Sequence, residues 1–144
     1  MSLNKAEVTL LVVEDDDLDA MAIKRTFKKL KVANNLVRAK DGVDALEYLR
    51  GENGKDKIAK PFMVLLDLNM PRMNGIELLE ALRMDNELKD SVVFVLTTSA
   101  TDKDKVAAYD YNVAGYIVKS DIESSFLEVI ELLDCYWKIV ALPR

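Results

Sequence analysis

The feature that most constrains the fold is an alternation of short apolar runs with amphipathic segments, repeated five times along the chain. The apolar runs are rich in β-branched residues and nearly continuous, as expected for strands that are covered on both faces. Between them, apolar residues recur at helical spacing. The predicted strands cover residues 8–13, 35–39, 62–66, 92–96 and 115–118, and the predicted helices cover residues 18–30, 43–50, 76–84, 102–111 and 120–140.

This alternation predicts an α/β fold in which helices cover both faces of a parallel sheet. Five units within 144 residues suit a flavodoxin-like (βα)5 domain, a doubly wound parallel sheet with strand order 2-1-3-4-5. The chain length fits one domain. In such sheets, functional residues follow the carboxyl ends of the strands, near the switch between the first and third strands.

Acidic, hydroxyl and basic side chains follow four of the predicted strands. Glu14 and Asp15 follow the first strand, Asp67 the third, Thr97 the fourth and Lys119 the fifth. Clustered carboxylates cannot all stay ionised without a cation, and hard oxygen ligands suit Mg²⁺. A carboxylate beside Mg²⁺ can attack a phosphoryl group, a reaction that needs mainly positioning and neutralisation of charge. The set therefore predicts a phosphoacceptor site in which the lysine and the threonine contact phosphoryl oxygens.

Each of these residues has a plainer explanation when it is taken alone. An Asp at a strand end is often a turn or capping residue. Asp16 and Asp17 suit that explanation well, because they stand where the first helix is predicted to begin. The joint placement of four such positions on successive strand ends is what favours a functional site.

The residues stand in the segments LLVVEDD, VLLDLNMPRMNG, VVFVLTTSA and GYIVKS, which resemble the receiver domain of two-component response regulators. The resemblance covers nearly the whole chain. It implies that Asp67 accepts a phosphoryl group from a histidine kinase, that Asp15 is a direct Mg²⁺ ligand and that Lys119 binds the phosphate.

The same resemblance implies further roles. Glu14 would contact the metal through water, and Asn69 would offer its backbone carbonyl to it. Thr97 would be the switch hydroxyl and Tyr116 the switch aromatic. The loop after the phosphoacceptor would be shaped by Pro71 and by Gly75, since glycine suits any left-handed backbone there.

Two positions depart from the family pattern. Glu14 replaces the commoner Asp, and its longer side chain could alter metal affinity. Ser120 stands where the family usually has proline, often after a cis bond. A cis bond before a non-proline residue costs ~2.5–4 kcal/mol, so we predict a trans Lys119–Ser120 bond. The spacing of Ser120 and Glu123 also predicts a capping box at the start of the last helix.

A narrower resemblance connects VEDDDLD, the KS pair after the last strand and YWKIVALP with small stand-alone regulators. Those are paired with cyanobacterial and bacteriophytochrome-type kinases and are often dimeric. The last predicted helix is apolar over more than one face, which favours a homodimer through it. Ordinary packing onto the chain's own core is the alternative. The apolar stripe consists of Ile122, Phe126, Val129, Ile130, Leu133, Tyr136, Trp137 and Val140, and Leu127, Leu132 and Cys135 lie outside it.

Composition excludes several functions. The net charge of −5 argues against a nucleic-acid surface, and the absence of histidine excludes His ligands, His bases and an internal phosphohistidine. No apolar run reaches the ~18 residues that span a membrane, and the first residues lack the layout of a secretory signal. With a single cysteine as well, we expect a cytoplasmic protein. We expect one receiver domain over residues 1–144, without an effector domain.

Other functions on similar folds suit the sequence less well. A haloacid-dehalogenase-like phosphatase needs an Asp two residues after its nucleophile, and here that position is Asn69. A flavodoxin needs a phosphate-binding loop after the first strand, and here that loop is the acidic EDDDLD. A pseudo-receiver that acts only through protein contacts remains an alternative, although the full acceptor, metal and lysine set argues against it. We expect no enzyme activity beyond weak self-phosphorylation from small donors and autodephosphorylation.

Overall fold

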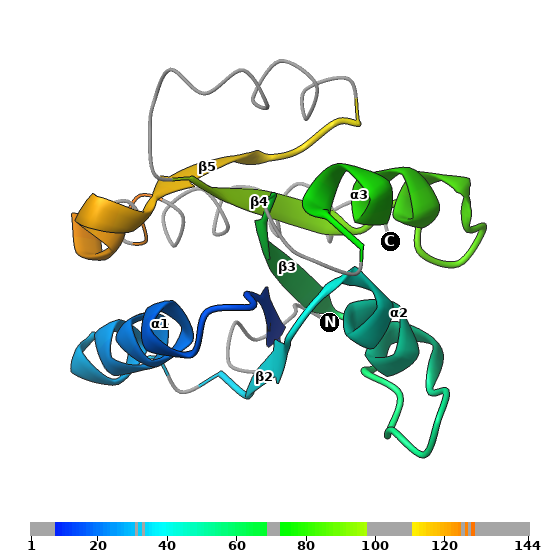
Figure 1. Cartoon of the computed structure of the whole chain (residues 1–144), viewed down its shortest axis with the longest axis horizontal. Helices are drawn as coiled ribbons and strands as arrows, with labels where there is room; N and C mark the ends of the chain where they lie inside the picture. The colour runs from blue at the N-terminus through cyan, green and yellow to red at the C-terminus, as the bar shows by residue number, and fades with distance from the viewer. Residues whose placement is uncertain are drawn as a thin grey trace, which may run out of the picture.

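Within the part of the chain that the structure describes, five strands form one parallel sheet in the order β2-β1-β3-β4-β5, seen in a computed structural model (Figure 1). The order and the alternation with helices confirm the predicted flavodoxin-like α/β fold. The structure describes residues 8–30, 32, 34–68, 73–97, 111–124, 126 and 128. The strands are β1 Thr9–Val13, β2 Leu36–Ala39, β3 Phe62–Asp67, β4 Val92–Thr97 and β5 Gly115–Val118, and the helices are α1 Asp17–Lys29, α2 Gly42–Arg50 and α3 Gly75–Met84, followed after β5 by the 3-10 turn η2 Lys119–Asp121.

The predicted boundaries agree with these elements to within one residue at each end. Two predicted helices are the exceptions. The predicted helix over 102–111 lies outside the described residues apart from Tyr111, which is in a turn. The last predicted helix is described only in its first residues. None of the described helices is long and apolar enough to cross a lipid bilayer.

The first helix begins where its acidic residues predict. Asp16 has extended backbone, and its Oδ1 accepts hydrogen bonds from the N–H groups of Leu18 at 2.8 Å and Asp19 at 3.1 Å. A side-chain oxygen at this position satisfies amide groups that have no partner inside the helix. Asp16 is therefore an N-cap, which confirms the plainer explanation for this residue.

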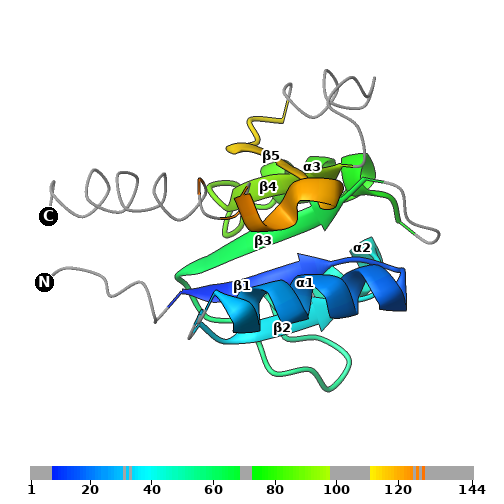
Figure 2. The same ribbon diagram turned by 90° about the vertical axis from the view of Figure 1, so that its left-hand side faces the viewer.

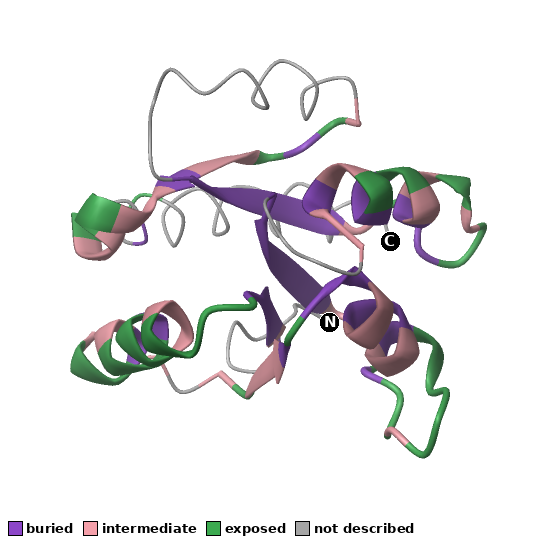
Figure 3. Cartoon of the chain, viewed as in Figure 1, coloured by how far each residue is buried: buried purple, intermediate pink, exposed green. Residues whose placement is uncertain are grey.

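Alternate side chains of the strands build a separate core on each face of the sheet. On one face, Leu11 and Val64 pack with the inner sides of α2 and α3. On the other face, Leu10 and Met63 pack with α1 and with Phe126. Figure 2 shows α1 lying over this face of the sheet. The central strands β3 and β4 are buried along their whole length (Figure 3). Coverage from both sides explains why these strands are apolar at every position before their last residues, Asp67 and Thr97.

The buried side of α1 differs from the apolar series in the sequence. Ile23 and Phe27 point into the core, whereas Leu18 and Met21 are 74% and 50% exposed. The prediction grouped Leu18 and Met21 with Phe27 at helical spacing. With ~3.6 residues per turn, however, Leu18 and Met21 lie on the opposite side of the helix from the buried pair. Phe27 instead contacts Phe126, with ring centroids 4.1 Å apart.

The chain after β5 turns back toward α1. Helical backbone begins at Lys119, and Ser120 lies inside the 3-10 turn, so the capping box predicted for Ser120 and Glu123 is wrong within the described residues. Glu123 accepts a hydrogen bond from Lys29 at 3.0 Å. The only cis peptide bond among the described residues precedes Pro61, so the Lys119–Ser120 bond is trans, as predicted.

The stripe proposed for a dimer can be followed only at its start. Ile122 and Phe126 pack against the core on the α1 side of this same chain. The remaining stripe residues, from Val129 to Val140, lie outside the described residues. The described part of the stripe therefore fits the alternative of packing onto the chain's own core.

Candidate functional site

The strand register brings the predicted site residues to one edge of the sheet. Val13 pairs with Leu66, the residue before Asp67, and Thr97 pairs with Val118, the residue before Lys119. Neighbouring strands therefore end at almost the same level. Residues that follow these strands share the carboxyl edge, as the sequence predicts.

Three carboxylates meet at this edge. Glu14, Asp15 and Asp67 each offer an oxygen, and these atoms all lie within 4.8 Å of one another. Glu14 and Asp67 are 0% and 7% exposed, whereas Asp15 is open to solvent. Oxygen ligands at this spacing, with one side facing water, suit a hard divalent cation such as Mg²⁺ that keeps part of its hydration shell.

Lys119 reaches into the same cluster from the end of β5. Its Nζ lies 2.5 Å from Glu14 Oε1, 3.2 Å from Asp67 Oδ2 and 3.1 Å from Asp19 Oδ2. One ammonium group thus faces three carboxylates. The structure confirms that Lys119 is close to the predicted phosphoacceptor, and it adds Asp19 of α1 as a partner.

The clustered charges and burial change the pKa of the Glu14 carboxyl group. Burial raises the pKa of its carboxyl group, and the neighbouring Asp67 raises it further, while Lys119 acts in the opposite direction; the result is a pKa of about 8. Glu14 Oε1 lies 2.5 Å from Lys119 Nζ but receives no hydrogen bond of normal geometry. Near neutral pH this carboxyl group therefore tends to hold a proton, which a bound cation would displace.

The pKa of Lys119 moves in the direction that keeps the ammonium charged. Burial by itself would lower the pKa, but the contacts with Glu14 and Asp67 outweigh burial and raise the pKa above its ordinary value. Lys119 is therefore a permanent positive charge at the site across the physiological pH range.

Gly75 packs closely against Leu68, the residue after the predicted phosphoacceptor Asp67. Its N–H donates to the Leu68 carbonyl at 2.9 Å, and a Cβ at this position would lie only 2.6 Å from Leu68 Cα. Gly75 does not have a positive φ, so a left-handed backbone is not the reason for a glycine at this position. The glycine is needed because α3 begins directly against the backbone that follows Asp67.

The remaining predicted site residues are Thr97, Tyr116, Asn69 and Pro71, and the structure describes only the first two. Thr97 is buried at the end of β4, next to β3, where the switch hydroxyl is expected. Tyr116 lies within β5 opposite Val95 and packs against the core on the α2 and α3 side. Asn69 and Pro71 lie outside the described residues.

Sequence reasoning missed one residue that contacts the site loop. Arg38 of β2 donates from Nε and Nη2 to the Glu14 carbonyl at 3.0 and 2.8 Å, and from Nη2 to the Asp15 carbonyl at 3.2 Å. Its Nη1 lies 2.7 Å from Asp17 Oδ1. The available signal was a single charged residue within a predicted strand, LVRA, next to the strand that carries the acids.

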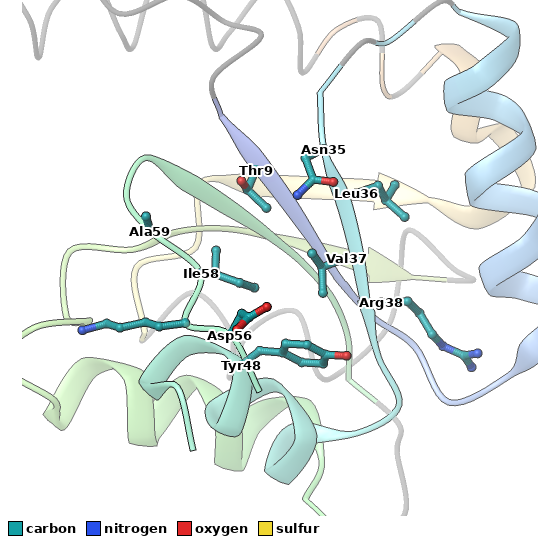
Figure 4. Close-up of a pocket in the computed structure, with 10 residues that line it drawn as sticks. Thr9, Asn35, Leu36, Val37, Arg38, Tyr48, Asp56, Ile58 and Ala59 are labelled. Atoms are coloured by element: carbon teal, nitrogen blue, oxygen red, sulfur yellow. The ribbon is translucent and has the colours of Figure 1, made fainter. Parts of the chain in front are cut away.

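A separate cavity of about 540 Å³ lies beside β2 (Figure 4). Its walls come from β2, from Tyr48 of α2 and from the segment around Ile58, and none of the clustered acids lines it. Arg38 borders this cavity, and its guanidinium extends away toward the loop between β1 and α1 (Figure 4). The acidic site is thus an open edge of the sheet and not part of this cavity.

Comparison with known proteins agrees with the fold and with this cluster. Residues 10–131 match the family model described as "Response regulator receiver domain". The response regulator Rcp1 of Synechocystis is 30% identical over 135 residues, which cover 93% of this chain and 92% of Rcp1. The chain therefore belongs to the family of response regulator receiver domains.

Solved structures of similar proteins extend the comparison. A two-component response regulator from Legionella pneumophila has a TM-score of 0.79 and 37% identity, covering 90% of this chain and 99% of that one. The phosphorylated cyanobacterial phytochrome response regulator RcpA has a TM-score of 0.74 and 32% identity, covering 94% and 97%. The Mn²⁺-bound form of Rcp1 has a TM-score of 0.71 and 28% identity, covering 90% and 94%.

Proposed function

We propose that this receiver domain accepts a phosphoryl group from a histidine kinase on Asp67, in a step that requires a divalent cation. The observation that supports this best is the position of the Asp67 carboxylate. It lies at the end of β3, with carboxylate oxygens of Glu14 and Asp15 within 4.8 Å and with Lys119 at 3.2 Å. A nucleophilic carboxylate, a cluster of cation ligands and a fixed positive charge are the components that aspartyl phosphorylation needs.

In the proposed step, a carboxylate oxygen of Asp67 attacks the phosphorus atom of a kinase phosphohistidine. A new P–O bond forms, the P–N bond breaks, and the electron pair of that bond stays with the imidazole nitrogen. The Lys119 ammonium lies close enough to Asp67 to balance charge on the phosphoryl oxygens. The Thr97 hydroxyl, at the end of the adjacent strand, would donate a hydrogen bond to one of those oxygens.

The residues present fit a Mg²⁺ ion. Three carboxylates share one edge, and Glu14 Oε1 receives no hydrogen bond of normal geometry. Asp15 and Asp67 would hold the ion directly, Glu14 would contact it through water, and Asn69 would supply a backbone carbonyl. When bound, the ion supplies positive charge that neutralises the carboxylates and the phosphoryl oxygens. The family relative Rcp1 has been crystallised with Mn²⁺, which supports a divalent metal here.

The test is phosphorylation by a small phosphodonor in the presence of Mg²⁺, followed by intact-mass measurement. The wild type should gain one phosphoryl group, and Asp67→Asn should gain none. Asp56→Asn is the matched control, because Asp56 is an exposed carboxylate in the loop before β3. Stable labelling of Asp67→Asn at another residue would contradict the assignment. An unlabelled wild type that still binds a partner would favour the pseudo-receiver alternative.

A phytochrome-type histidine kinase is the proposed phosphodonor. Support comes from RcpA, which is a phytochrome response regulator and was crystallised in the phosphorylated state. A phosphotransfer profile against a panel of histidine kinases tests the proposal. The panel should include phytochrome-type and unrelated kinases, and the phytochrome-type kinases should transfer fastest to this chain. Equal rates across the panel would count against the pairing.

Signal output is proposed to pass through partner binding or dimerisation, with Thr97 and Tyr116 as the residues that respond to phosphorylation. The domain would catalyse at most slow self-phosphorylation and autodephosphorylation. For a homodimer through the last helix, sedimentation of the wild type and of Trp137→Ala should be compared across a concentration series. A wild type that stays monomeric at high micromolar concentration, with and without phosphorylation, would reject the dimer.

A further inference from the structure

One set of contacts that the proposed function does not use joins the edge strand β2 to the loop that carries Glu14 and Asp15. We infer that Arg38 is a positioning residue that fixes the orientation of the Glu14–Asp15 backbone and so presents both carboxylates to a divalent cation. The inference rests on the proposed function, because it takes the acidic edge to be the metal site.

Arg38 holds the loop by its backbone carbonyls. The Glu14 carbonyl accepts two hydrogen bonds from the guanidinium, at 3.0 and 2.8 Å, and the Asp15 carbonyl accepts a third at 3.2 Å. The Glu14 N–H donates in turn to the Ala39 carbonyl at 3.0 Å. The strand β2 therefore contacts the Glu14 peptide groups on both sides of its Cα, which leaves that residue little rotational freedom.

The guanidinium also reaches the first turn of α1. Nη1 lies 2.7 Å from Asp17 Oδ1, and the pKa of the Asp17 carboxyl group is lowered by Arg38. Asp16, between the two contacts, is the N-cap of α1. One side chain thus spans the whole turn from strand to helix. Arginine suits this task because its planar group presents several donors in a fixed geometry, and charged donors form stronger hydrogen bonds than neutral ones.

The direction in which cation affinity changes when Arg38 is replaced distinguishes a positioning role from a purely electrostatic one. Removing a positive charge beside a metal site should tighten cation binding if charge alone matters. Removing a group that holds the ligands in place should weaken it, typically by about tenfold or more for partners behind the ligands. Arg38→Met removes the charge and the hydrogen bonds together, so the direction of the change decides between the two explanations.

Two variants provide matched controls. Lys40→Met removes a positive charge that also acts on Asp17, and within the described part of the chain the Lys40 side chain makes no hydrogen bond to the loop carbonyls. Arg50→Met removes an arginine that pairs with Asp85 on the α2 and α3 side, away from the acidic loop. Arg38→Lys keeps the charge but cannot reproduce the three-point contact.

The experiment titrates each full-length variant with Mn²⁺ alone and follows free Mn²⁺ by electron paramagnetic resonance. Hydrogen exchange of the Asp16, Leu18 and Asp19 amides is measured in the metal-free protein. Arg38→Met should bind Mn²⁺ about tenfold more weakly and exchange these amides faster, and Arg38→Lys should recover only part of both. Lys40→Met and Arg50→Met should match the wild type or bind slightly more tightly.

Unchanged or tighter Mn²⁺ binding by Arg38→Met, with loop amides as protected as in the wild type, would overturn the inference. If Arg38→Met does not fold, Arg38→Lys decides by the same two measurements. Neither readout needs phosphorylation. A failure of Asp67 to accept a phosphoryl group would therefore reject the proposed function and leave the result on Arg38 intact.

Discussion

Two lysines of this protein are each held between carboxylates, and they differ in how well those carboxylates are satisfied. Lys55 lies 3.0 Å from both Asp44 and Glu47, at the surface beside α2. The second oxygen of Asp44 accepts the Lys40 N–H at 2.9 Å, and the second oxygen of Glu47 accepts from Asn53. Every carboxylate oxygen of this surface cluster has a hydrogen-bond or ion-pair partner. The cluster therefore serves as a structural contact with no oxygen left to bind a ligand.

The Lys119 cluster is built differently. One ammonium faces Glu14, Asp19 and Asp67, and Asp15 lies close by. Glu14 Oε1 receives no hydrogen bond of normal geometry, and Oε2 accepts a long contact of 3.4 Å from the Asp16 N–H. Buried carboxylates in this condition need more positive charge than the chain supplies. Incomplete satisfaction is therefore what distinguishes a binding site from a structural ion pair.

The largest difference should appear in phosphoryl acceptance. Lys119→Met should lower the rate of phosphorylation by a small donor by about a hundredfold, because it removes the fixed charge beside Asp67. Lys55→Met should leave the rate unchanged. The measurement is intact mass against time at saturating Mg²⁺, with circular dichroism to verify folding. Equal rates for the wild type and Lys119→Met would show that the two clusters are not functionally different.

Substitutions of a metal ligand and of a residue at the start of α1 should differ in their effect on Mg²⁺ affinity. Asp15→Asn should weaken Mg²⁺ binding by about tenfold or more, because it removes one of the three clustered carboxylates. Asp17→Asn should have a smaller effect, since the Asp17 carboxylate pairs with Arg38. Calorimetric titration of both variants checks this order. Equal losses would mean that the wrong acid has been identified as the ligand.

The stability of the metal-free protein should depend on pH through Glu14. The pKa of its carboxyl group is about 8 in the folded protein and 4.5 in the reference state, so the folded state binds more protons between these values. The free energy of unfolding should therefore fall as pH rises from about 4.5 to 8, by a few kcal/mol at most. Denaturant unfolding of the wild type and of Glu14→Gln, in the presence of a chelator and across this pH range, measures the free energy of unfolding.

Glu14→Gln should flatten this dependence, because the variant cannot titrate at this position. Asp44→Asn, in the surface cluster, should retain it. Mg²⁺ should also reduce the fall above pH 7 in the wild type, since the ion stabilises the ionised carboxylates. A wild type whose stability rises from pH 5 to pH 8 in chelator would show that Glu14 does not hold its proton.

The smallest effect is expected for the surface cluster. Lys55→Met should lower the thermal midpoint only slightly, and the difference should shrink in high salt. The Lys55 ion pairs are only partly buried, and ion pairs near the surface contribute little and are screened. Differential scanning calorimetry at low and high salt checks both statements. A large decrease in the thermal midpoint that does not depend on salt would mean that the Lys55 cluster contributes more to stability than a surface ion pair does.

The sequence predicts the sheet order and the acidic edge because both follow from local pattern. Strand ends can be read from the apolar runs, and parallel topology then brings Asp67 and Lys119 together. The contacts of Arg38 and Asp19 could not be predicted, because they depend on side chains that reach across elements far apart in the chain. The role of Gly75 depends on how closely α3 approaches Leu68, which no residue spacing records.

The contact between Lys119 and Asp19 spans 100 residues of chain, and this has a consequence for synthesis on the ribosome. Every acid of the site emerges before the lysine that balances them. The aromatic contact of Phe27 with Phe126 is likewise completed only by a late residue. A nascent chain that already contains β1 to β4 therefore carries a cluster of uncompensated negative charge and one partly uncovered face, and residues made after β5, Lys119 and Phe126, complete the two.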